Sequence, residues 1–145
     1  MKQESERRRR AHREATAAEL NYKFNKGRNI YANAEEKTRM EKLNPLLVEQ
    51  MKNFIDKIPS MQKNKALEVA CGECMVSRDI LIDRFFEIDL IDQSDGAIEH
   101  ANTLKVKCPK IRNIHTSTMQ KFTTEKKYNC IVLRFCTGYL VDEEL

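Results

Sequence analysis

One stretch, residues 66–94, constrains the fold of this chain more than any other. It begins with a short apolar run, residues 66–70, which breaks into the small residues Cys71 and Gly72. Apolar residues then recur at helical spacing, at Val76, Ile80, Leu81 and Phe85. Residues 87–92 alternate charged and apolar side chains, which is typical of a strand. The stretch therefore predicts a βαβ unit, in which a helix connects two parallel strands.

The carboxyl ends of the two predicted strands carry the candidate site. Ligands in such α/β folds bind beyond the carboxyl ends of the strands. Here that edge carries Glu68 and Gly72 on the first strand and Asp92, followed by Gln93, on the second. A turn of small residues lets a ligand approach the backbone, and a carboxylate at a strand end can accept both hydroxyls of a ribose. These residues predict a nucleoside-cofactor site, although an ordinary turn with surface acids gives the same short pattern.

The rest of the chain supplies further elements of an α/β fold. Residues 34–43 are helix-prone, and Asn44 and Pro45 predict the start of a second helix that ends before Pro59. We expect one face of this helix to pack on the domain, through Leu47, Met51, Phe54, Ile55 and Ile58.

Ser94 is a candidate cap for a helix with Ile98, Ala101 and Leu104 directed inward. Residues 111–114 predict a third strand, and residues 128–135 form the strongest buried-strand run, including Ile131.

Composition indicates three regions within 145 residues: a tail at 1–28, a helical extension at 29–64 and an α/β domain at 65–145. The tail holds nine Lys or Arg against four Glu, so it carries the basicity of the chain. It is either a solvated charge run or an arm that binds nucleic acid or an acidic partner through Arg7, Arg8, Arg9 and Arg10. No apolar run approaches the length of a membrane span. An intracellular location, in cytoplasm or nucleus, fits the five cysteines without a framework spacing.

Two of those cysteines, Cys71 and Cys74, form a C-x-x-C at the predicted junction of strand and helix. The simplest interpretation is that they fill the turn. A redox pair also fits this position, because a helix N-terminus lowers the pKa of a thiol. A zinc site needs two further ligands, and there is no second C-x-x-C.

From residue 65 onward the layout resembles the class I S-adenosylmethionine-dependent methyltransferases, and most closely the alpha-N-terminal protein methyltransferase family. Glu68 matches the acid that ends the first strand, and Gly72 matches the central glycine of a Gly-x-Gly-x-Gly turn, with Ala70 and Cys74 at the outer glycines. Asp92 matches the acid that receives the ribose hydroxyls. The resemblance implies a Rossmann-like sheet in the order 3-2-1-4, with helices on its faces.

The same resemblance implies S-adenosylmethionine as the cofactor and a protein N-terminal amine as the methyl acceptor. Met119 and Gln120 match the pair that frames the adenine, and Phe135 and Tyr139 would line the acceptor site. Four positions depart from the family: Met75 replaces an arginine that pairs with the cofactor's carboxylate, Arg134 a glutamine, Phe135 a tryptophan and Tyr139 a histidine.

These departures leave two functions open. The first is a methyltransferase that acts on a protein amine. The second is a catalytically inactive relative that serves as a subunit of a larger complex. The family pattern continues beyond the fourth strand, so we expect this chain either to pair with a partner or to be part of a longer product.

Overall fold

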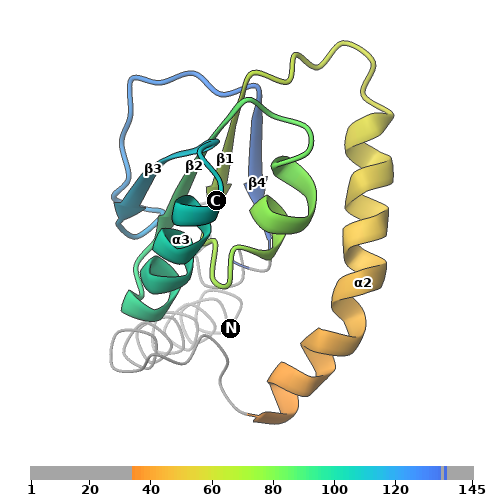
Figure 1. Cartoon of the computed structure of the whole chain (residues 1–145), viewed down its shortest axis with the longest axis vertical. Helices are drawn as coiled ribbons and strands as arrows, with labels where there is room; N and C mark the ends of the chain where they lie inside the picture. Colours follow the sequence, from red (N-terminus) through yellow and green to blue (C-terminus); the bar gives the residue numbers. More distant parts are fainter. Residues whose placement is uncertain (1–33, 135, 137–145) are drawn as a thin grey trace, which may run out of the picture.

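The computed structural model describes residues 34–134 and Cys136. Within them a four-stranded sheet is built from β1 (Lys65–Val69), β2 (Glu87–Asp92), β3 (Ile111–Thr116) and β4 (Cys130–Leu133). All neighbouring strands are parallel, and their order is β3-β2-β1-β4 (Figure 1). The predicted α/β class and the strand order 3-2-1-4 are confirmed.

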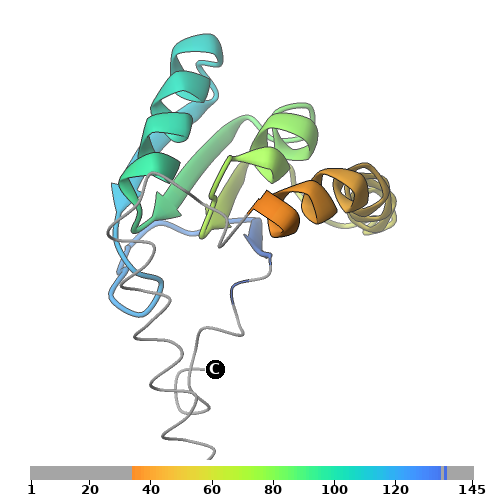
Figure 2. The ribbon, with the colours of Figure 1, turned by 90° about the horizontal axis from the view of Figure 1, so that it is seen from below.

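Three helical segments lie on one face of this sheet, as Figure 2 shows. They are α2 (Ala34–Asp56), the short crossover helix η1 (Ser77–Leu81) and α3 (Asp95–Lys107). The crossover has π-helical hydrogen bonding, because Ile82 N donates to Ser77 O. Its predicted apolar stripe is buried as expected, at Val76, Ile80, Leu81 and Phe85. A helix thus connects β1 to β2, and the βαβ unit is confirmed.

The helix α2 differs from the prediction because it continues through Pro45 instead of starting there. Asn44 does not act as a cap, since its side-chain oxygen accepts a hydrogen bond from Arg134 Nη2 at 2.6 Å. The inward face is also shifted. Ile55 is buried and Val48 and Met51 pack against the core, whereas Phe54 is 68% exposed. Ile58, predicted to face inward, is exposed as well.

A bidentate ion pair connects the end of α2 to the domain. Arg84 Nε and Nη2 donate to the two carboxylate oxygens of Asp56, at 2.9 and 2.6 Å. The hydrogen bond from Arg84 is the largest cause that lowers the pKa of Asp56. Arg84 therefore anchors α2 beside the crossover helix that it contacts.

Two apolar clusters lie on opposite faces of the sheet. The larger packs under the helices and includes Ala66, Ile88, Leu90 and Ile111. The smaller consists of Leu67, Val69 and Ile91, with Met119, Phe122 and Tyr128 packed against it. Figure 2 shows the connection from β3 to β4 on this second side, away from the helices.

The strand β4 is less buried than its sequence predicts. It lies at the end of the sheet order, and its pairing partner among the described residues is β1. Val132 points toward the helices and is buried, but Ile131 is 54% and Leu133 48% exposed. Both lie in register with Leu67 and Val69, on the face opposite the helices. The prediction that Ile131 is buried is therefore wrong, because the described residues that pack on this face do not cover that end of it.

Candidate functional site

Asp92 and Gly72 meet at the carboxyl edge of the sheet. The backbone N–H of Gly72 donates to Asp92 Oδ2 at 3.0 Å, and Ser94 N donates to Asp92 Oδ1 at 2.9 Å. Cys71 N also donates to Ile91 O at 3.0 Å, which continues the pairing of the two strands into the turn. The end of β2 and the turn after β1 are thus held side by side, as the βαβ prediction requires.

The turn keeps a glycine-type backbone although it contains one glycine. Ala70, Gly72 and Cys74 all have positive φ, at 54°, 52° and 56°. These alternate positions are the ones at which the resemblance places glycines. A non-glycine residue in this region has an unfavourable contact between its β-carbon and the backbone. The chain therefore retains the backbone path of the turn while β-carbons stand at two of its three special positions.

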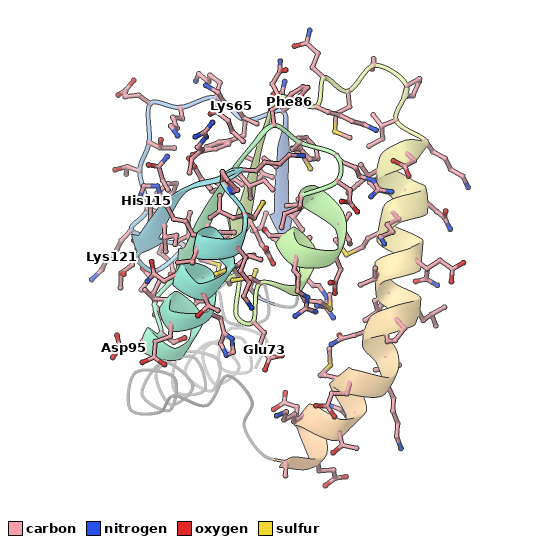
Figure 3. The ribbon with its side chains drawn as sticks, viewed as in Figure 1. Lys65, Glu73, Phe86, Asp95, His115 and Lys121 are labelled. Carbon is pink, nitrogen blue, oxygen red and sulfur yellow. The ribbon has the colours of Figure 1, made fainter. Side chains whose placement is uncertain are left out.

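The start of α3 completes the edge. Ser94 has extended backbone angles, and its Oγ accepts from Ala97 N at 3.3 Å, which confirms the predicted cap. Figure 3 shows Glu73, in the turn, and Asp95, at the start of α3, at the same end of the sheet, whereas Lys65 and Phe86 lie at the other end. Gln93, between Asp92 and the cap, is partly buried.

Glu68, predicted to contact the cofactor, is 4% exposed and faces the crossover helix. One carboxylate oxygen, Oε2, accepts hydrogen bonds from the backbone nitrogen of Ser77, at 2.9 Å, and from its hydroxyl group. Burial raises the pKa of Glu68 to about 7, although these hydrogen bonds and the charge of Arg134 act in the opposite direction. Glu68 thus joins β1 to the start of the crossover helix, on the two sides of the turn.

Arg134 brings a cation to the turn from the end of β4. Its Nη1 lies 3.4 Å from the sulfur of Met75, and its Nη2 donates to Asn44. It also lies close enough to Glu68 to favour the charged form of that carboxylate. Met75 occupies the position at which the resemblance places an arginine. The guanidinium of Arg134, from a distant position in the sequence, lies beside it. Reasoning from sequence missed this, because no local pattern connects residues 75 and 134.

The remaining predicted residues divide into two groups. Met119 packs on the second cluster and Gln120 is exposed, so both lie in the connection between β3 and β4. This connection begins at the site, because Ser117 N donates to Asp92 O at 3.0 Å. Phe135 and Tyr139 lie outside the described residues, as do Arg7, Arg8, Arg9 and Arg10 of the basic tail.

The two turn cysteines are both buried, Cys71 at 5% and Cys74 at 1% exposure. The neighbouring Cys74 and burial raise the pKa of the Cys71 thiol, so it stays protonated and poorly nucleophilic at neutral pH. Among the described residues no three His, Cys, Asp or Glu side chains are grouped as metal ligands. These observations favour the interpretation that the cysteines fill the turn.

The residues at this edge fit an S-adenosyl ligand. Asp92 uses one lone pair of each carboxylate oxygen on the backbone, which leaves acceptor capacity for hydroxyl groups. Beside the turn, Arg134 supplies a cation for a carboxylate. Among the described residues no helix is long and apolar enough to cross a membrane.

Comparisons with known proteins agree with this geometry. A family model described as AdoMet-dependent proline dimethyltransferase matches residues 39–145, so the match begins within α2. A Leishmania major S-adenosylmethionine-dependent methyltransferase has the same fold, with a TM-score of 0.74 and 20% identity over 91% of this chain and 52% of that one.

Two curated relatives bear the name alpha N-terminal protein methyltransferase 1. The Drosophila melanogaster protein is 29% identical over 63% of this chain and 35% of its own length. The Dictyostelium discoideum protein is 30% identical over 60% of this chain and 33% of its own length. This chain thus spans about a third of the length of the curated relatives it matches. The family match, the sheet order and the turn beside Asp92 together show that the chain belongs to the AdoMet-dependent proline dimethyltransferases.

Proposed function

We propose that this chain carries the cofactor-binding part of an S-adenosylmethionine-dependent protein N-methyltransferase. The observation that carries the proposal is the hydrogen bond between Gly72 N and Asp92 Oδ2. It places a ribose-type acceptor and a turn of positive-φ residues at one edge of the parallel sheet. S-adenosylmethionine, the cofactor of the family, supplies an electrophilic methyl group on a sulfonium.

Each predicted residue has a proposed role at this edge. Asp92 accepts hydrogen bonds from the ribose hydroxyls, with Gln93 beside it, and the backbone at Gly72 approaches the ligand. Met119 and Gln120 flank the adenine. Glu68 acts indirectly, because its carboxylate is occupied by Ser77 and holds the crossover helix in place.

Arg134 is proposed to hold the carboxylate of the cofactor in place of the arginine that Met75 replaces. The geometry supports this because Nη1 of Arg134 lies 3.4 Å from the sulfur of Met75. A guanidinium can bind a carboxylate with two parallel hydrogen bonds, which an apolar side chain cannot. The contact with Asn44 also draws this cation toward α2, so it need not face an incoming amine.

The proposed acceptor is the free α-amine of a protein that begins with proline, as the family description suggests. Such an amine attacks the methyl group when it is neutral, so it must first lose a proton. Phe135 and Tyr139 are proposed to line the acceptor site. The protein's own contribution would then be to position the two reactants, because methyl transfer in line needs close and aligned atoms.

Mass spectrometry of peptides after incubation with S-adenosylmethionine tests this function. We expect methyl groups on a peptide with a free N-terminal proline and none on the same peptide with an acetylated N-terminus. The Asp92→Ala variant serves as the control for contaminating activity. If neither peptide gains a methyl group while the ligand binds, the chain is a ligand-binding relative without catalysis. This second function, a subunit of a larger complex, is the alternative that the four family departures left open.

A further inference from the structure

A buried carboxylate, Asp89, lies on the sheet face opposite the helices. It is 2% exposed and stands in the middle of β2, in register with Leu67 of β1 and Asn113 of β3. Its position is separate from the edge where Asp92 meets Gly72. Neither the family match nor the proposed function assigns it a role.

Four hydrogen bonds converge on this carboxylate. Oδ1 accepts from Asn113 N at 3.0 Å and from Asn113 Nδ2 at 2.9 Å. Oδ2 accepts from Lys126 Nζ and from Tyr128 Oη, each at 2.8 Å. A buried carboxylate is costly unless it is paired and hydrogen-bonded, and these donors satisfy it fully. Asp89 therefore connects β2 to Asn113, Lys126 and Tyr128.

Near neutral pH the carboxylate of Asp89 is ionised and the hydroxyl of Tyr128 keeps its proton. Burial raises the pKa of Asp89, but the hydrogen bonds from Lys126, Tyr128 and Asn113 outweigh burial and hold it below its ordinary value. Burial and the same carboxylate raise the pKa of Tyr128 to about 12, so its hydroxyl remains a donor. The cluster is thus a permanent structural link near neutral pH.

Two of the donors belong to the connection between β3 and β4, residues 117–129. Lys126 and Tyr128 lie near its end, whereas its start is bonded to the carbonyl of Asp92 through Ser117 N. Between these two attachments, Met119 and Phe122 pack on Leu67, Val69 and Ile91. The segment that carries Met119 and Gln120 is therefore fixed at both ends to β2.

We propose that Asp89 is a positioning residue for ligand binding. Its carboxylate clamps the β3–β4 connection onto the sheet and thereby sets where Met119 and Gln120 stand beside the S-adenosyl ligand. The effect on the ligand rests on the proposed function, whereas the clamp itself does not. Loss of the clamp leaves the atoms at Asp92 and Gly72 unchanged and weakens binding because a loosened segment must be ordered each time the ligand binds.

The chain contains no tryptophan, so Phe122→Trp introduces one selective fluorophore in the connection. The ring of Phe122 lies 5.0 Å from that of His115 and packs on the sheet. In this background we compare Asp89→Asn with Asp83→Asn, which removes the same charge at an exposed position. We expect Asp89→Asn to shift the tryptophan emission to the red and increase its quenching by acrylamide, with an unchanged far-ultraviolet circular dichroism spectrum. Asp83→Asn should change neither.

The affinity for S-adenosylhomocysteine, measured by calorimetry on the same variants, tests the positioning role. We expect Asp89→Asn to weaken binding about tenfold, which corresponds to the loss of one hydrogen bond to a charged group at the weak end of its usual range. Tyr128→Phe removes a single donor and should weaken binding less. Added to Asp89→Asn, it should cause no further loss, because both changes act through one contact. Should Asp89→Asn fail to fold, Tyr128→Phe alone carries the comparison.

Unchanged emission and quenching in Asp89→Asn would overturn the clamp. A red-shifted and more strongly quenched emission in Asp89→Asn, with an affinity for S-adenosylhomocysteine equal to that of Asp83→Asn, would overturn the positioning role. If the parent protein binds no S-adenosylhomocysteine, the proposed function fails, and the fluorescence comparison still decides whether the clamp exists.

Discussion

Gly72 N donates to Asp92 Oδ2 at 3.0 Å, so the turn after the first strand is bonded to the acid that ends the second. Ser94 N occupies the other oxygen, Oδ1, at 2.9 Å. A single carboxylate thus fixes the turn and the entry to α3 at once. Ligand binding and local structure share this residue, and its variants must affect both.

Asp92→Asn should lower the free energy of unfolding by about 1–3 kcal/mol. In the native protein both carboxylate oxygens accept a backbone N–H, from Gly72 and Ser94, whereas in the variant one of these N–H groups would face the amide nitrogen, which cannot accept it. Urea denaturation followed by circular dichroism measures this. Asp95→Asn, at the exposed first position of α3, is the matched control and should cost less. Equal losses in the two variants would mean that the Asp92 contacts contribute little.

Ala70→Gly should stabilise the protein by about 1 kcal/mol, because Ala70 has φ of 54° and a glycine there avoids the β-carbon contact. The control is Ala101→Gly in the interior of α3, which should destabilise it by about 1 kcal/mol as helix propensity and a buried methyl are lost. Chemical denaturation of both variants gives the comparison. A loss of stability in Ala70→Gly would contradict the assigned backbone conformation.

Glu68 predicts a specific pH dependence. Its native pKa is about 7 against a reference value of 4.5, so the unfolded state releases this proton first as pH rises. Its contribution to stability is therefore lost between about pH 4.5 and 7, at about 1.4 kcal/mol for each unit of pKa difference. Glu68→Gln should lack this loss, so its stability relative to the original protein should improve across that range. Parallel profiles of unfolding free energy against pH would contradict the raised pKa.

Arg134→Gln should weaken the binding of S-adenosylhomocysteine by about tenfold or more, since a charged hydrogen bond contributes about 1.5–3 kcal/mol. The matched ligand is methylthioadenosine, which lacks the amino-acid carboxylate and should bind both proteins equally. Calorimetric titration of each ligand gives the ratio. An equal loss for the two ligands would place Arg134 away from the carboxylate.

A second variant sharpens that comparison. Adding Met75→Arg to Arg134→Gln returns a guanidinium to the turn, and part of the lost affinity should return with it. No recovery in a folded double variant would mean that position 75 does not face the carboxylate.

The sequence was sufficient where local patterns decide the structure. The apolar spacing of the crossover, the cap at Ser94 and the acid at the end of β2 all follow from residues close together in the chain. The continuation of α2 through Pro45 was not predictable in this way. Proline removes one helical donor and usually ends a helix, and here the helix is also held by packing and by the Arg84–Asp56 pair.

Long-range polar contacts were also beyond the sequence. The alternation of β2 marks Asp89 as a polar strand residue, which indicates an exposed side chain. Its donors lie between 24 and 39 positions further along the chain, so only the fold brings them together. The contact of Arg134 with Met75, 59 positions apart, has the same origin.

Calorimetric titration of the folded chain with S-adenosylhomocysteine tests the central claim, that the edge formed by Gly72 and Asp92 holds an S-adenosyl ligand. We predict saturable binding to a single site, weakened at least tenfold in Asp92→Ala and unchanged in Asp95→Ala, three residues further along the same edge. No heat of binding and no rise in melting temperature at millimolar ligand would contradict the account, as would equal affinities in the two variants.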